Sequence, residues 1–331
     1  MNNSSLATLG NITTTFSPIS SSSRPCLPLQ DKIPQMAPVA RLVMAIVHLL
    51  LGFIGLPTNG LAAYLIIKTR QFENQSTRLV MYLSIFDGIG SIIINGASAM
   101  YMLAYEEIDC VILLVVHGIV NLSIFCCFSI IVLIGFDRLL RILYLNDYSL
   151  VFSEGRYKVS LIVAAVSTVI QSILIFIGFY MFGYGYATMF SLPINVIGLV
   201  FMIICYCMSI SKLKEMNERS RQISNTDRSV VRIASLHLAM FVCCFTPTVI
   251  WQVVNKLLLS KFLPGYIDIL VVFGLYVLVS VHSSFNGFIF LTVNREARQQ
   301  ILRFFNQVMQ RLRRFFNREQ VAPAVPVELN N

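Results

Sequence analysis

The sequence predicts an all-α membrane protein: a seven-transmembrane-helix bundle with a C-terminal amphipathic helix on the membrane surface. Three observations predict this fold class. Of the 331 residues, 56% are hydrophobic and only 12% are charged, whereas about a quarter of the residues in a soluble domain are charged. Seven apolar segments are long enough to cross a hydrocarbon core, which takes about 20 residues. A segment with helical periodicity and one apolar face follows the last of them.

The expected spans are mostly apolar runs. They cover Arg41–Ile67, Leu79–Tyr105, Val111–Leu143, Tyr157–Phe182, Met189–Ile210, Val230–Val254 and Tyr266–Val293. Lys and Arg gather in the gaps after the first, third and fifth spans and in the tail, whereas the gap after the second span is acidic. Positively charged loops stay in the cytoplasm, so we expect a plasma-membrane protein with its N-terminus outside and its C-terminus inside. The net charge of +9 then reflects topology and not nucleic-acid binding.

This topology divides the chain into four parts. Residues 1–38 form an extracellular tail, 39–293 the transmembrane domain, 294–318 a cytoplasmic amphipathic helix and 319–331 a disordered tail. The first tail has no apolar run of signal-peptide type, and sequons at Asn2, Asn3 and Asn11 predict that it carries glycans. Of the eight cysteines, only Cys26 and Cys110 fall in outer stretches, where oxidising conditions permit a bridge.

The segment after the last span places its apolar residues three and four positions apart. They are Ile301, Phe304, Phe305, Val308, Met309, Leu312, Phe315 and Phe316. Arginines surround this stripe, which predicts a helix lying flat in the anionic inner leaflet with its basic side chains at the lipid headgroups. A soluble coiled coil is the alternative, although the stripe is wider than a heptad seam.

Polar and ionisable residues inside the spans are candidates for function, because they are costly in lipid. Asp87 lies in the middle of the second span, and Asn59, His282, Ser283 and Asn286 lie at comparable depth. A neutral, hydrogen-bonded structural aspartate is the alternative for Asp87.

Two further features lie near the cytoplasmic side. Asp137-Arg138 ends the third span, where Arg138 either pairs with its neighbour or meets a partner. The alternative is a plain positive-inside anchor. Pro247 in the sixth span removes a backbone hydrogen bond and should kink that helix.

These residues resemble motifs of the rhodopsin-like (class A) G-protein-coupled receptor family, in the family's order and each on the expected helix. The resemblance covers the chain from the first span to the tail helix. The matching residues are Asn59-Gly60, Leu83 with Asp87, Asp137-Arg138-Leu139, Tyr206, Cys244-Phe245-Thr246-Pro247 and Asn286-Gly287-Phe288-Ile289-Phe290.

The resemblance implies a two-state receptor in which an extracellular ligand favours outward swing of the sixth helix, opening a cleft for a heterotrimeric G protein. Arg138 would bind the G protein, and Asp227 would hold Arg138 in the resting state. A sodium ion would sit on Asp87, with oxygens from Ser123, Ser283 and Asn286.

The sequence departs from the family at several positions. Gly287 and Phe290 replace the helix-seven Pro and Tyr, so the water-mediated link to Tyr206 found in relatives is excluded. The second outer loop, expected over 183–187, has no cysteine. We therefore expect Cys26 to bond Cys110 in place of the family's usual bridge.

The pocket implied by the resemblance lacks an amine counter-ion, because Val120 occupies that position, and Ser280 replaces the lysine that binds retinal. The remaining pocket candidates are His117, Asn121, Trp251, Gln252 and Tyr276. This polar, nearly uncharged set suits a peptide or a lipid better than an amine, and interhelical packing is the alternative for each residue. The ligand itself stays unidentified.

No enzyme is predicted, because the sequence has no phosphate-binding glycine loop, His-Glu-x-x-His or Gly-x-Ser-x-Gly motif. A seven-span transporter is one alternative function, although no repeated halves are visible. A receptor-shaped protein without G-protein signalling is the other, which the altered motifs keep open.

Overall fold

The computed structural model describes residues 33, 36–104, 108–144, 147–182, 184–219, 225–254 and 265–320. All regular structure within these ranges is helical, which confirms the predicted all-α class. The elements are α2 (Pro38–Lys68), the 3-10 turn η2 (Gln71–Glu73), α3 (Gln75–Ala104), α4 (Cys110–Leu143), α5 (Tyr148–Val151), α6 (Glu154–Phe182), α7 (Tyr184–Arg219), α8 (Asn225–Val254), α9 (Gly265–Val293) and α10 (Arg295–Gln320).

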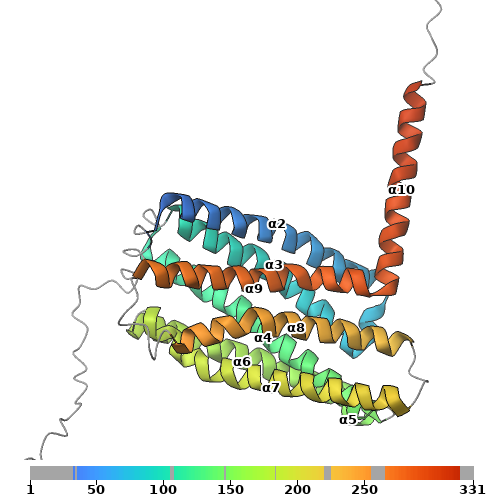
Figure 1. Ribbon diagram of the computed structural model, residues 1–331, viewed down its shortest axis with the longest axis horizontal. Helices are drawn as coiled ribbons and strands as arrows, with labels where there is room; N and C mark the ends of the chain where they lie inside the picture. Colours follow the sequence, from blue (N-terminus) through green and yellow to red (C-terminus); the bar gives the residue numbers. More distant parts are fainter. Residues whose placement is uncertain are drawn as a thin grey trace, which may run out of the picture.

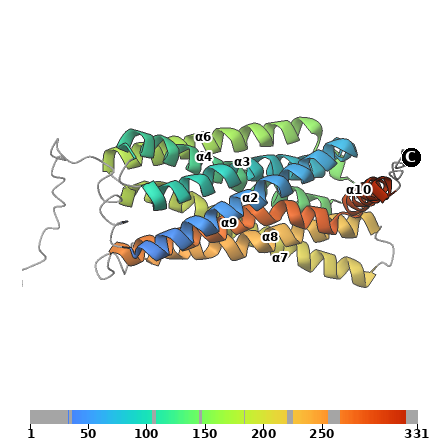
Figure 2. The same cartoon turned by 90° about the horizontal axis from the view of Figure 1, so that it is seen from above.

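The long helices lie side by side along one axis, and α10 turns away from them at the end of the bundle where the short helix α5 also lies, on the opposite side (Figure 1). We call this end the α10 end. Viewed from above, α2 and α9 lie close together over much of their length (Figure 2), and α2 packs against both α3 and α9. Helix α4 contacts α3, α6, α7 and α8, so it runs through the centre of the bundle.

Local signals in the sequence explain where several helices begin. Helix α2 starts at Pro38, whose ring suits the first turn of a helix. The Asp109 carboxylate caps α4 by accepting the Val111 amide at 2.7 Å. The Asn294 side-chain oxygen accepts a hydrogen bond from the Ala297 amide nitrogen at 3.0 Å. Asn294 therefore caps the N-terminus of α10 and separates it from α9.

Within the described residues, six helices are long and apolar enough to cross a membrane. These stretches are Pro38–Lys68, Gln75–Ala104, Leu114–Leu143, Glu154–Gly178, Leu192–Lys212 and Leu270–Val293. Helix α8, which holds the remaining expected span, contributes a shorter apolar stretch, Ala239–Trp251. Large apolar side chains face outward, such as Phe53 at 81% exposure and Ile197 at 68%. A surface this apolar belongs to a membrane protein.

The structure corrects the loop expected over 183–187, because α7 already begins at Tyr184. A helix satisfies its backbone polar groups internally, so it can continue through this segment near the lipid. Pro57 and Pro193 also lie inside helices, in addition to Pro247.

Glycines allow α9 to approach α2 closely. A Cβ atom on Gly287 would lie 2.6 Å from the Thr58 carbonyl carbon, so only glycine fits there. Beside this contact, the Asn59 side chain donates to the Ser283 carbonyl at 2.7 Å, and Thr58 Oγ1 donates to the Ser284 carbonyl at 3.1 Å. Gly287, which departs from the family motif, is therefore required by helix packing in this chain.

Several predictions fall on residues that the structure does not describe. Asn2, Asn3, Asn11 and Cys26 lie outside the described residues, and the Cys110 side chain is likewise not described, so the glycans and the bridge stay predictions. The six cysteines in apolar runs are free.

Candidate functional site

A buried polar core surrounds Asp87 in the middle of α3. The Asp87 side chain is fully buried, and the Asn286 amide donates to its Oδ2 atom at 2.6 Å. Ser283 and Cys127 also approach the carboxylate, yet Oδ1 makes no hydrogen bond within the described part of the chain. An acceptor oxygen buried without a partner requires a cation, a proton or a water molecule to complete it.

The structure brings most of the predicted core residues together. Asn59 donates hydrogen bonds to the Gly55 carbonyl of its own helix and to the Ser283 carbonyl, and the second of these bonds ties α2 to α9. His282 Nε2 lies 3.4 Å from the Asn286 amide nitrogen. The residue of α4 beside Asp87 is Cys127, which the prediction did not include. Ser123 lies one turn earlier, next to Gly90.

A second polar cluster, which the sequence analysis missed, joins α2 to α3 further from the α10 end. His48 Nδ1 lies 2.9 Å from Asn95 Oδ1, and the Asn95 amide donates to the Ser91 carbonyl at 2.7 Å. A signal was present in the sequence, since His48, Gly52, Gly55 and Asn59 follow the three-and-four spacing of one helix face.

At the α10 end, Asp137 accepts hydrogen bonds from two helices. Ser76 Oγ of α3 donates to Asp137 Oδ2 at 2.6 Å, and the Tyr148 hydroxyl of α5 donates to Oδ1. Arg138 is buried beside it, with Nε 3.7 Å from Oδ2. The predicted Asp137–Arg138 pair is therefore present. Ser76 and Tyr148 were missed, because only folding brings them to Asp137.

Tyr148 keeps its proton in this arrangement. Burial, followed by the neighbouring Asp137 carboxylate, raises the pKa of Tyr148 to about 12. The Arg141 guanidinium stacks on the Tyr148 ring at 4.7 Å and donates to Asn74 Oδ1 at 3.3 Å. These contacts hold α5 against the bundle. The Asp227 side chain, predicted to hold Arg138, lies outside the described residues.

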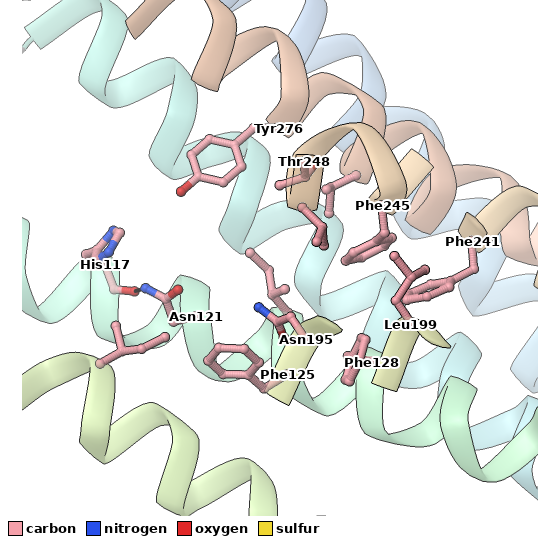
Figure 3. Close-up of a pocket in the computed structure, with 14 residues that line it drawn as sticks. His117, Asn121, Phe125, Phe128, Asn195, Leu199, Phe241, Phe245, Thr248 and Tyr276 are labelled. Atoms are coloured by element: carbon pink, nitrogen blue, oxygen red, sulfur yellow. Dashed lines mark hydrogen bonds between the residues drawn. The ribbon is translucent and has the colours of Figure 1, made fainter. Parts of the chain in front are cut away.

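A cavity of about 70 Å³ lies among α4, α6, α7, α8 and α9. Figure 3 shows His117, Asn121 and Tyr276 toward one side of it, and Phe128, Phe241, Phe245 and Leu199 toward the other. The full lining is His117, Asn121, Ile124, Phe125, Phe128, Ile175, Asn195, Leu199, Phe241, Phe245, Thr248, Val249, Tyr276 and Val279.

Three of the predicted pocket residues, His117, Asn121 and Tyr276, line this cavity. Two other predicted residues are not part of this lining. Val120 packs in a core cluster that also holds Phe125 and Ile175 of the cavity wall, and Trp251 lines an apolar groove between α8 and α9 with Pro247. Their positions depend on the direction in which each side chain points around its helix. The Gln252 side chain lies outside the described residues.

Aromatic rings connect the cavity to the polar core. Phe245 stacks on Phe241 with ring centroids 4.3 Å apart, and the edge of His282 meets Phe245 at 5.5 Å and Phe241 at 5.7 Å. His282 in turn lies beside Asn286, the partner of Asp87. Phe245 and Phe241, which line the cavity, are therefore connected to the buried carboxylate of Asp87 through His282 and Asn286.

Two further predicted switch residues, Phe290 and Tyr206, lie in the apolar core nearer the α10 end. Phe290 is buried there, and Tyr206 packs against the same cluster. Pro247 lies inside α8, two residues from Phe245.

The fold and this site define an all-helical membrane protein with a cavity on one side of a buried acid and an arginine–aspartate pair at the α10 end. No protein-family model matches the chain, and no curated protein matches it.

Proposed function

We propose that the chain is a G-protein-coupled receptor that converts binding of an extracellular ligand into activation of a heterotrimeric G protein. The series of contacts from Phe245 through His282 and Asn286 to Asp87 carries this proposal. It joins a cavity that can hold a ligand to the buried Asp87 carboxyl group. The resemblance in motif order supports the same assignment.

The proposal includes a topology. Helix α8 is the seventh span, and the bundle lies in the plasma membrane with the α10 end in the cytoplasm. Arginine-rich α10 turns away from the bundle at that end (Figure 1), which suits an amphipathic helix lying in the inner leaflet. Its arginines would contact anionic lipid headgroups.

In the proposed mechanism, a ligand in the cavity presses on Phe245 and Phe241, which are both part of α8. Pro247 gives α8 a flexible point, because one backbone hydrogen bond is missing there. Outward movement of α8 would then expose Arg138 to the G protein.

A sodium ion at Asp87 fits the orphaned Oδ1 atom, with further oxygens from Ser283 and Asn286. Cys127 replaces the oxygen donor expected from Ser123, and a thiol is a poor ligand for a hard cation. We therefore expect sodium to bind more weakly than it would at a site with a hydroxyl in that place.

Nucleotide exchange on purified G proteins tests the proposed function. Arg138→Ala is expected to reduce the exchange rate by about tenfold or more, the scale for losing a buried interface arginine. Arg78→Ala is the matched control, because Arg78 lies at the same end and makes a partly exposed ion pair with Glu154. It should leave exchange nearly unchanged. Equal exchange by wild type and Arg138→Ala would contradict the proposed role.

One observation favours a second candidate, a receptor-like protein without G-protein signalling. Phe290 is buried and has no hydroxyl to link with Tyr206. Absence of exchange with every G protein tested, in a protein that binds its ligand, would select this alternative.

A further inference from the structure

The cavity carries no charge among its lining side chains. Its fourteen residues include His117, Asn121, Asn195, Thr248 and Tyr276 as polar members, and the other nine are apolar. An ion placed there would lose its hydration without gaining a counter-charge, which is strongly unfavourable. The lining therefore selects against ammonium and carboxylate ligands.

Two polar side chains of the cavity can meet a ligand. The Thr248 hydroxyl on α8 is buried and has no hydrogen-bond partner among the described residues, and Asn195 on α7 is half-buried in the lining of the same cavity. Asn121 differs, because its amide already donates to the His117 carbonyl at 2.8 Å. Figure 3 shows Asn195 between Phe125 and Leu199, inside the ring of lining side chains. Leaving the buried Thr248 hydroxyl unpaired is costly, so it marks where a ligand is recognised, and Asn195 offers a second hydrogen-bonding group in the same lining.

The size of the cavity restricts the ligand further. A volume of about 70 Å³ corresponds to roughly five to seven water-sized groups, at about 10–15 Å³ for each. A compact molecule fits this space. The four phenylalanines offer flat apolar surfaces against which its body can pack.

The geometry points to a small uncharged ligand whose accepting oxygen, such as a carbonyl, takes hydrogen bonds from Asn195 and Thr248 while its apolar body contacts Phe125 and Phe245. This inference rests on the proposed function, since it names the ligand class of the receptor's cavity. It narrows the peptide-or-lipid expectation to compact neutral molecules.

Binding to the purified full-length chain tests this ligand class without any G protein. The probes are cyclohexanone, methylenecyclohexane and cyclohexylammonium, which share shape and size but differ in oxygen and charge. Binding is measured by saturation-transfer NMR on the protein in lipid nanodiscs. We expect cyclohexanone to bind about tenfold or more tighter than methylenecyclohexane, the scale of two net hydrogen bonds at about 0.5–1.5 kcal/mol each. Cyclohexylammonium should show no binding.

Matched variants separate recognition from partitioning into lipid. Thr248→Val with Asn195→Leu keeps the shape of the cavity and removes both polar groups, so the preference for the ketone should vanish. Its melting temperature without ligand should not fall, because the buried Thr248 hydroxyl has no partner among the described residues and both replacements are apolar side chains in a largely apolar lining. Val249→Phe fills the cavity and should abolish binding of both neutral probes.

Three results would overturn the assignment: equal binding of ketone and hydrocarbon by wild type, binding of the ammonium ion as tightly as the ketone, or a ketone preference that survives in the double variant. Binding unchanged in Val249→Phe would likewise reject it in favour of lipid partitioning. A failure of nucleotide exchange with these binding results intact would reject only the proposed signalling.

Discussion

Gly287→Ala is expected to lower the free energy of unfolding by about 3 kcal/mol, as overpacking against an unyielding neighbour does. The added Cβ would lie 2.6 Å from the Thr58 carbonyl carbon and 2.7 Å from the Asn59 amide nitrogen. Both atoms belong to the backbone of α2, so no side chain can rotate away. Relief requires α9 to move away from α2, which would stretch the Asn59 hydrogen bond to Ser283.

Gly274→Ala on the same helix is the matched control. A Cβ at Gly274 meets nothing within 4 Å, so the change keeps the packing and improves helix propensity. Thermal denaturation in detergent should show a clearly lower melting temperature for Gly287→Ala and an equal or higher one for Gly274→Ala. Equal melting of both variants would mean that α2 and α9 are not in close contact at Gly287.

Asp137→Ala is expected to destabilise the protein by about 3 to 5 kcal/mol, the cost of removing one partner of a buried charge pair. Ser76 and Tyr148 would lose their acceptor, and Arg138 would keep its buried charge without the nearby carboxylate. The measurement is the melting temperature of purified protein, with Arg78→Ala as the control for loss of a partly exposed ion pair.

Tyr148→Phe isolates the contact of α5 with Asp137. The loss should be about 1 kcal/mol, and in the double variant with Asp137→Ala the two losses should not add, because both remove the same hydrogen bond. Additive losses would show that Tyr148 and Asp137 do not interact.

The same contact has a predicted pH dependence. Burial raises the pKa of Tyr148 from 10.0 to about 12. The stability that Tyr148 contributes is therefore complete below pH 10 and is lost as the pH rises toward 12. Wild type and Tyr148→Phe should differ by a constant amount between neutral pH and about pH 9, and a difference that changes within that window would contradict the assignment.

The apolar segments, and the polar residues that lie inside them, can be identified from the sequence alone. The all-α class and six apolar stretches long enough for a membrane follow from local composition, because each helix must satisfy its own backbone in lipid. Asp87, Asn59 and Asn286 were recognisable for a related reason, since a polar residue in an apolar run must find a buried partner. Asp137 and Arg138 are neighbours in the chain, so the sequence raised their pairing as one of two possibilities, and the structure places Nε 3.7 Å from Oδ2.

Tertiary structure alone decided which side chains meet across helices. Cys127 replaced Ser123 at Asp87, Asn195 and Thr248 entered the cavity while Trp251 and Val120 did not, and Tyr148 reached Asp137 from a separate short helix. Each outcome depends on the rotation and axial position of one helix against another. Packing of side chains and glycine contacts from distant parts of the chain determines these quantities, and the periodicity of a single segment does not contain them.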